Sequence, residues 1–177
     1  MSRDPLAKPD ELIRRVYSYV AYRIGPGSDA EDVTSEAMLR AVRYRSSFDP
    51  KRGKPLSWLI GIARTCIADH QSARMLSVSE PPELVSEEDV AHDVVERLSL
   101  VEAVSRLDSK DRELVALRYG ADLSTRQIAD LLEMSPNAVD VALHRCRTRL
   151  RVELEGTSRA TVRQRSRVAR PQAEPGR

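Results

Sequence analysis

The sequence predicts an all-α fold made of two small helical domains joined by a flexible acidic linker, the second a helix-turn-helix four-helix domain. Three observations support this prediction. Aromatic residues make up 4% of the 177 residues, which is too few for an all-β domain. Apolar residues recur at helical spacing in most segments. Residues 77–96 instead combine many acids and two prolines with weak periodicity, which is typical of a solvated linker.

The first domain, residues 1–76, is expected to form three helices. Residues 10–24 carry apolar side chains at four-residue spacing and end at a Gly-Pro-Gly sequence. The next helix, 28–45, begins with a predicted capping box of Ser28 and Glu31. The remaining segments are a loop at 46–55, with two prolines, a glycine and three cations, and a helix at 57–75.

The second domain, residues 97–155, is expected to form four helices. The first ends at Leu107, and Asp108 is a suitable N-cap for the second, which stops near the glycine at position 120. The third starts with a capping box of Ser124 and Gln127 and runs to about position 133. The fourth starts at Ser135-Pro136 and ends near Leu154. Residues 156–177 hold six arginines and little to bury, and they are predicted to be a disordered basic tail.

The helices at 124–133 and 136–152 have the arrangement of a helix-turn-helix. Ile128 and Ala129 of the first are placed to pack on Val139 of the second, and the small alanine allows a close approach. The second helix carries one aspartate against four arginines, a balance that suits a DNA phosphate backbone. The pattern therefore predicts binding to duplex DNA, against the alternative of an ordinary helical hairpin with a solvated basic face.

A second basic segment follows the second predicted helix. Phe48 lies among the loop cations Lys51, Arg52 and Lys54, and Arg64 with Thr65 falls on an outward helix face. Cations beside an aromatic ring are suited to single-stranded nucleic acid. Trp58 is expected to be a core residue, and the alternative is that it provides a surface on which bases stack.

The helix at 28–45 carries a charged stripe opposite its apolar one, which we expect to be free to meet a partner. No other segment predicts a reactive or metal site. Cys66, Asp69 and His70 share a helix face, but without a fourth ligand they are interpreted as structural, so no metal, cofactor or catalytic residue is expected. The N-terminus lacks the apolar segment of a signal peptide, and no run is long enough to cross a membrane, which predicts a cytoplasmic protein.

Three segments, in this order, resemble the extracytoplasmic-function (ECF) sigma factors, the promoter-recognition subunits of bacterial RNA polymerase. Residues 29–43 are similar to the helix that docks on the polymerase clamp coiled coil. Residues 46–70 are similar to the promoter-melting segment, and 107–151 to the region that binds the minus-35 element and the flap. The resemblance implies a bacterial sigma factor that is not itself an enzyme, with core polymerase, promoter DNA and an anti-sigma factor as partners.

The resemblance assigns roles to individual residues. The docking residues would be Asp29, Asp32, Glu36, Arg40 and Arg43. The melted promoter strand would meet Phe48, Lys51, Arg52, Lys54, Trp58, Arg64 and Thr65. Duplex DNA would meet Ser124, Thr125, Arg126, Asn137, Ala138, Asp140, Val141, His144, Arg145, Arg147 and Arg149. Because two cations usual at the start of the recognition helix are missing, its arginine-rich second half would carry more of the contact.

Two other functions remain open at this stage. A stand-alone helix-turn-helix regulator would bind duplex DNA by itself, usually as a dimer, but it would leave residues 28–75 unexplained. A helical interaction protein, such as a regulator of another sigma factor, would leave the arginines at 145–151 unexplained. Transcription with core polymerase separates the sigma factor from both.

Overall fold

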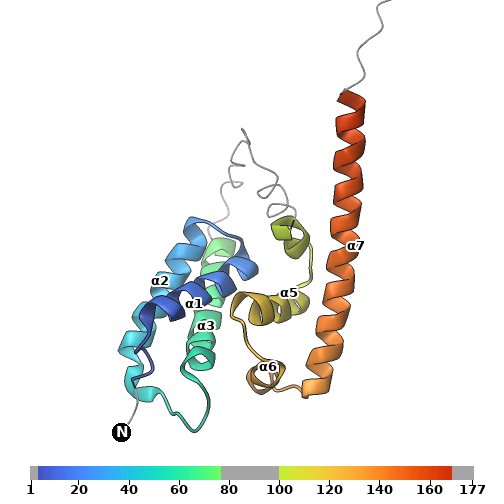
Figure 1. Ribbon diagram of the computed structural model, residues 1–177. Helices are drawn as coiled ribbons and strands as arrows, with labels where there is room; N and C mark the ends of the chain where they lie inside the picture. The colour runs from blue at the N-terminus through green and yellow to red at the C-terminus, as the bar shows by residue number, and fades with distance from the viewer. Residues whose placement is uncertain (1–3, 77–99, 169–177) are drawn as a thin grey trace, which may run out of the picture.

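The computed structural model describes residues 4–76 and 100–168, with the backbone alone for residues 156–168 (Figure 1). These residues form helices and no strand, which confirms the predicted fold class. The helices of the first part are α1 (Pro9–Ile24), α2 (Ser28–Arg43), the short 3-10 helix η1 (Arg45–Ser47) and α3 (Pro55–Leu76). The second part has a helical segment at 100–105, α5 (Ser109–Val115), the π-helix η2 (Ala116–Gly120), α6 (Thr125–Leu132) and α7 (Pro136–Val168).

Residues 4–76, called lobe one below, form a three-helix bundle. The apolar faces of α1, α2 and α3 meet at residues such as Val16, Ala37 and Leu59, which are fully buried. Alanines at positions 30, 37, 41 and 63 line the same interior, and their small side chains let the helices approach closely. The outer face of α2 remains exposed, whereas α3 also contacts α6 of the second part of the chain.

The start of α2 differs from its prediction. Ser28 is the first helical residue, Gly27 is the N-cap, and no side chain caps the helix, so the expected Ser28–Glu31 capping box is wrong. Gly27 has φ of 123°, a conformation that glycine adopts without a steric cost. Because the chain turns at this glycine, Ser28 enters the helix one position too late to act as its cap.

The predicted caps of the second part, called lobe two (residues 100–168), are confirmed. The Asp108 carboxylate accepts hydrogen bonds from the backbone N–H groups of Lys110 (3.0 Å) and Asp111 (2.9 Å). Ser124 and Gln127 form a complete capping box at the start of α6. Ser135 Oγ accepts a hydrogen bond of 3.2 Å from the Ala138 N–H at the start of α7. Side chains thus fix where the short helices begin.

We expect Ser124→Ala to lower the free energy of unfolding by about 1 kcal/mol, the usual cost of a lost serine cap. The substitution leaves the Gln127 N–H without the Ser124 Oγ acceptor, 3.3 Å away. Urea unfolding followed by circular dichroism measures the change. Ser72→Ala, at an exposed position within α3, is the control and should be neutral or slightly stabilising, since alanine favours helix. An equal loss in both variants would contradict the assigned cap.

Helix α7 is longer than predicted. It was expected to end near Leu154, with a disordered tail beyond, but it continues to Val168, so that expectation is wrong for residues 156–168. Gly156 is the poorest helix former between positions 155 and 168, and a glycine costs only about 1 kcal/mol within a helix. At about 1.5 Å per residue, α7 is about 50 Å long and projects away from the bundle (Figure 1).

The two lobes pack against each other. One continuous core contains Val16, Tyr19 and Leu59 of lobe one together with Leu117 and Ile128 of lobe two. In Figure 1, α5 and α6 lie beside α1 and α3. The predicted linker at 77–96 lies outside the described residues. The lobes that this linker joins share part of one core.

Candidate nucleic-acid interface

The helix-turn-helix is built by local geometry. Glu133 ends α6 in the left-handed conformation, with φ of 55°, and the Met134 N–H donates to the Ala129 carbonyl at 2.9 Å. This turn brings α7 back across α6. Ile128 and Val139 are fully buried between the two helices, and Ala129 is 2% exposed, as the sequence predicted. The direction of α7 is therefore set by packing, and its outer face is left for binding.

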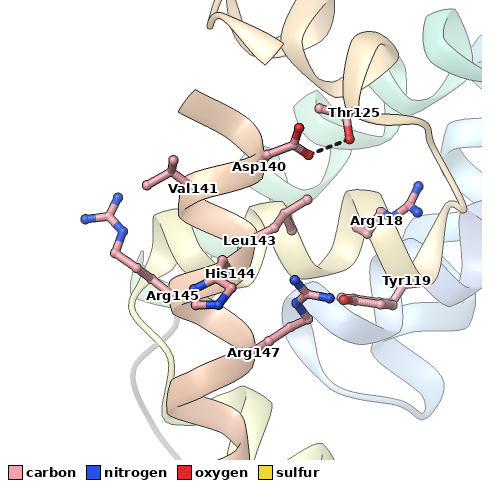
Figure 2. A pocket seen from close by; sticks show the side chains of 9 residues that line it. All are labelled: Arg118, Tyr119, Thr125, Asp140, Val141, Leu143, His144, Arg145 and Arg147. Atoms are coloured by element: carbon pink, nitrogen blue, oxygen red, sulfur yellow. Dashed lines mark hydrogen bonds between the residues drawn. The ribbon is translucent and has the colours of Figure 1, made fainter. Parts of the chain in front are cut away.

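A hollow of about 660 Å³ lies between that outer face and η2 (Figure 2). Arg118 and Tyr119 line it from η2, while His144 and Arg147 line it from α7. Thr125 Oγ1 donates a hydrogen bond of 2.9 Å to Asp140, which fastens the start of α7 to the start of α6. Several cations line this concave surface. They favour an anionic ligand such as the phosphate backbone of a nucleic acid.

Most of the predicted duplex-binding residues are exposed, and those of α7 from position 140 to 147 line the hollow together with Thr125. Thr125 and Ala138 are half-buried. The exposed ones are Ser124, Arg126, Asn137, Asp140, Val141, His144, Arg145 and Arg147. In Figure 2, Arg145 and Arg147 extend from opposite sides of α7. They give the helix a positive charge on both edges.

Arg149 is engaged elsewhere. Its guanidinium forms ion pairs with Asp111, and with Asp108 at 3.4 Å, so it ties α7 to the start of α5 instead of lining the hollow. Sequence reasoning missed Arg118 and Tyr119, and Tyr119 is 46% exposed. Arg118 was read as part of an ordinary helix, and no periodic signal separates it from a solvated cation. Its Nη1 donates to the Leu123 carbonyl at 2.9 Å, which holds it at the edge of the hollow.

The predicted strand-binding residues gather at a second cleft, of about 710 Å³. Phe48 and Trp58 pack as a tilted aromatic pair with ring centroids 5.6 Å apart. Trp58 is half-buried and packs against the core, which agrees with the core role expected for it, and it also lines the cleft. Arg52, Lys54 and Thr65 line the same cleft. Aromatic faces next to cations provide stacking and phosphate contacts together.

Two predicted strand-binding residues do not line this cleft. Lys51 is exposed in the loop beside it. Arg64 points to lobe two, where its Nε lies 3.2 Å from the Glu113 carboxylate. The opposite wall of the cleft is also formed by lobe two, through Ser124, Arg126 and Gln127 of the α6 region.

The charged stripe of α2 is only partly free, contrary to expectation. Arg40 pairs with Glu36 on its own helix and with Asp69 of α3, both at 2.7 Å. Asp29 pairs with Arg74 of α3 at 2.8 Å. These contacts brace α2 against α3. Asp32 and Arg43 remain exposed on the helix.

Two exposed apolar side chains on α2 were missed from the sequence. Leu39 is 58% exposed and Val42 is 60% exposed. They are three residues apart, so they share one face of the helix. They form a small exposed apolar patch beside the charged stripe of α2.

The face of α3 with Cys66, Asp69 and His70 holds structural contacts. Asp69 pairs with Arg40, and His70 Nε2 lies 3.5 Å from Asp29. Burial raises the pKa of the Cys66 thiol, and that of Cys146 to about 12, which disfavours the reactive thiolate at both. Across residues 4–76 and 100–168, no group of three or more His, Cys, Asp or Glu side chains is placed to hold a metal ion. In the same residues, no helix is long and apolar enough to span a bilayer.

Comparison with protein families finds a match for each lobe. The family described as Sigma-70 region 2 matches residues 10–75, and Sigma-70, region 4 matches residues 97–150. Over 146 residues the chain is 33% identical to the ECF RNA polymerase sigma factor BldN of Streptomyces coelicolor. That match covers 77% of this chain and 54% of BldN, so the chain spans about half the length of that relative. ECF RNA polymerase sigma factor SigD of Mycobacterium tuberculosis is 31% identical over 170 residues, which cover 86% of this chain and 78% of SigD.

Two solved structures are similar in fold. The sigma factor RpoE, in complex with the anti-sigma factor NepR from Bartonella quintana, superposes with a TM-score of 0.67 at 18% identity, covering 81% of this chain and 92% of that one. CnrH, in complex with the cytosolic domain of CnrY, gives a TM-score of 0.58 at 22% identity, with 85% of each chain covered. Both likenesses concern the arrangement of the helices.

Proposed function

The chain belongs to the extracytoplasmic-function RNA polymerase sigma factors of the sigma-70 family, and we propose that it directs core polymerase to promoters by dividing recognition between its lobes. Lobe two would read upstream duplex DNA. Lobe one would dock on core polymerase and hold the melted downstream strand. The chain itself would perform no catalytic step and would work in the bacterial cytoplasm. The RpoE structure contains an anti-sigma factor, and we propose a protein of that class as a further partner.

The capped helix-turn-helix carries this proposal. An α-helix fits the major groove of duplex DNA, where each base pair presents a distinct pattern of donors and acceptors. Helix α7 presents His144, Arg145 and Arg147 on its exposed face, while its other face is fixed in the core by Val139 and Leu143. A rigid helix with an exposed basic face is the arrangement that duplex recognition requires.

The side chains of lobe one support the proposal that it holds the melted strand. A melted strand offers unstacked bases and a flexible backbone, which suit aromatic faces and cations better than a single inserted helix. The Phe48–Trp58 pair, with Arg52 and Lys54 around it, provides both kinds of contact. The proposed docking residues are Asp29, Asp32, Glu36, Arg40 and Arg43, to which we add Leu39 and Val42 because they are exposed on the same helix.

Reconstituted transcription tests the proposal. The purified chain is mixed with core RNA polymerase and a library of randomised promoter DNA, and the transcripts are sequenced. We expect transcripts from a subset of templates that share two sequence elements at a fixed spacing, and none when the chain is omitted. Specific binding to duplex DNA without any transcript would instead favour the stand-alone regulator.

Charge reversal on α2 tests docking. Asp32→Lys should weaken binding to core polymerase about tenfold, because a charge matched to the partner then becomes repulsive. Asp32 is exposed, so the helical circular dichroism spectrum should not change. Asp10→Lys makes the same change at an exposed position of α1 and is the control. Fluorescence-detected titration with core polymerase gives both affinities, and equal values would contradict the docking surface.

A further inference from the structure

One anion lies on the basic face of α7. Asp140, in the second turn of the helix, borders the hollow together with His144 and Arg147 (Figure 2). It is exposed, and within the described residues its carboxylate forms no ion pair. An unpaired negative charge repels DNA phosphates, so it weakens the attraction of this face for every DNA sequence alike. Any favourable contact of Asp140 with DNA must therefore be with a base and not with a phosphate.

Thr125 orients the Asp140 carboxylate. Thr125 is the first residue of α6, and its Oγ1 donates a hydrogen bond of 2.9 Å to Asp140 Oδ1. The adjacent Val139 is fully buried, which fixes the backbone of α7 at this point. An ionised carboxylate accepts hydrogen bonds at both oxygens, so Oδ2 can accept another one while Oδ1 is held. The second oxygen is thus a preorganised acceptor on a rigid helix.

The position of Asp140 along α7 places it toward the bases. In a helix-turn-helix, the N-terminal residues of the second helix contact base edges. Asp140, His144 and Arg147 are four and three residues apart, so they form one stripe. Arg147 lies about 10 Å farther along the helix axis than Asp140, at about 1.5 Å per residue. In a groove about 12 Å wide, this spacing lets Arg147 reach the phosphates at the rim while Asp140 faces the bases.

The groups in the major groove decide which base suits a carboxylate. Guanine and thymine present acceptors there, which repel a carboxylate. Adenine presents an amino donor next to its N7 acceptor, so attraction and repulsion oppose each other. Cytosine presents only its N4 amino group, which is a donor. A carboxylate that Thr125 holds at one oxygen therefore fits cytosine best.

We propose that Asp140, positioned by Thr125, selects a cytosine in the upstream duplex. The inference rests on the proposed function, because it takes α7 to enter the major groove. Replacement of that cytosine by guanine or thymine removes a hydrogen bond and brings two acceptors together, so these bases should be disfavoured about tenfold or more. Asp140 thereby lowers the affinity for DNA in general and raises the preference for one base, which is a gain in specificity.

Substitutions at both residues separate this role from a purely structural one. Asp140→Asn keeps the shape and still accepts a hydrogen bond from Thr125, but an amide also donates, and asparagine pairs best with adenine. Thr125→Val removes the hydroxyl with little change of shape, whereas Thr125→Ser retains it. Glu133→Gln removes the same charge as Asp140→Asn from an exposed position at the end of α6 and is the matched control. Circular dichroism verifies that each variant is folded.

The readout is the frequency of each base at each position of a randomised upstream element. The full chain and core polymerase transcribe a pool of duplex templates, each with a barcode in its transcribed part. We expect one position at which the wild type favours cytosine about tenfold. Asp140→Asn should shift the preference at that position to adenine, and Thr125→Val should reduce the preference about threefold. Thr125→Ser and Glu133→Gln should retain it.

Four results would overturn the inference. Base frequencies that Asp140→Asn leaves unchanged would limit Asp140 to joining α6 and α7. Changes spread over all positions would show that the variant tilts α7 and does not lose one base contact. An equal change in Glu133→Gln would reduce the effect to net charge. An unchanged preference in Thr125→Val would overturn the positioning by Thr125.

Failure of the proposed function gives a different result. A wild-type chain that yields no transcript from any template would refute the sigma-factor function. Capture of the same duplex pool by the chain without polymerase would then decide whether Asp140 selects cytosine. Capture of no duplex would overturn both proposals, since α7 would not bind the major groove.

Discussion

Replacing both Arg145 and Arg147 with alanine is expected to weaken binding to the upstream promoter duplex about thirtyfold or more. The two side chains are exposed and extend from opposite sides of α7, so both can reach DNA when the helix enters a major groove (Figure 2). Basic contacts of this kind contribute about 1–3 kcal/mol each, and a loss of 1.4 kcal/mol is about tenfold in affinity.

The dependence of the affinity on salt distinguishes phosphate contacts from base contacts. Each phosphate contact that is lost should reduce the slope of log affinity against log salt by about 0.9, whereas a lost base contact changes sequence preference. Fluorescence anisotropy with the duplex promoter at several salt concentrations measures the slope, and scrambled duplex measures the specificity.

A second double variant is the control for this experiment. Arg106→Ala with Arg149→Ala also removes two cations from lobe two, but from side chains in ion pairs: Arg106 with Glu102 and Glu153, and Arg149 with Asp111. It should lose stability more than DNA affinity. An equal loss of affinity in the two double variants would mean that DNA responds to the total charge of lobe two and not to one face of α7.

The sequence was sufficient to predict features that depend on residues close together along the chain. The caps at Asp108, Ser124 and Ser135 each involve a hydrogen bond to a residue within three positions, so composition and spacing reveal them. The helix-turn-helix followed from two such caps and an apolar period. The ends of helices were harder to predict, because ending a helix a few residues earlier or later changes the free energy of folding little. Gly156, for example, does not end α7.

Contacts between distant residues had no signal in the sequence. Tyr19 and Glu113 are 94 positions apart, and nothing near either one indicates that they meet. Gly120 was read as the end of a helix, which is the commoner use of glycine, although its role is to admit α1. Arg64 was assigned to an outward face by its helical period, and it is exposed there, but its pairing with Glu113 of lobe two had no signal in the sequence.

Replacing both Arg52 and Lys54 with alanine is expected to reduce open-complex formation about tenfold, with little effect on binding to the closed duplex. Both side chains are exposed and line the cleft beside the Phe48–Trp58 pair. Neither lies in lobe two, which is proposed to hold the duplex, so early binding should not need them. In the double variant, the phosphates of the separated strand lack two cationic partners. The melted complex is therefore destabilised relative to the closed one.

A template with a pre-melted bubble tests this assignment. Breaking the stacking of DNA costs about 1.4 kcal/mol per base-pair step, and a bubble removes that cost before the protein binds. The bubble should therefore restore a large part of the transcription lost by the double variant. Lys8→Ala with Arg14→Ala removes the same charge from the exposed start of α1 and should behave as the wild type on both templates. If the Arg52 and Lys54 variant is equally impaired on duplex and bubble, the two cations only attract DNA and do not stabilise the open strand.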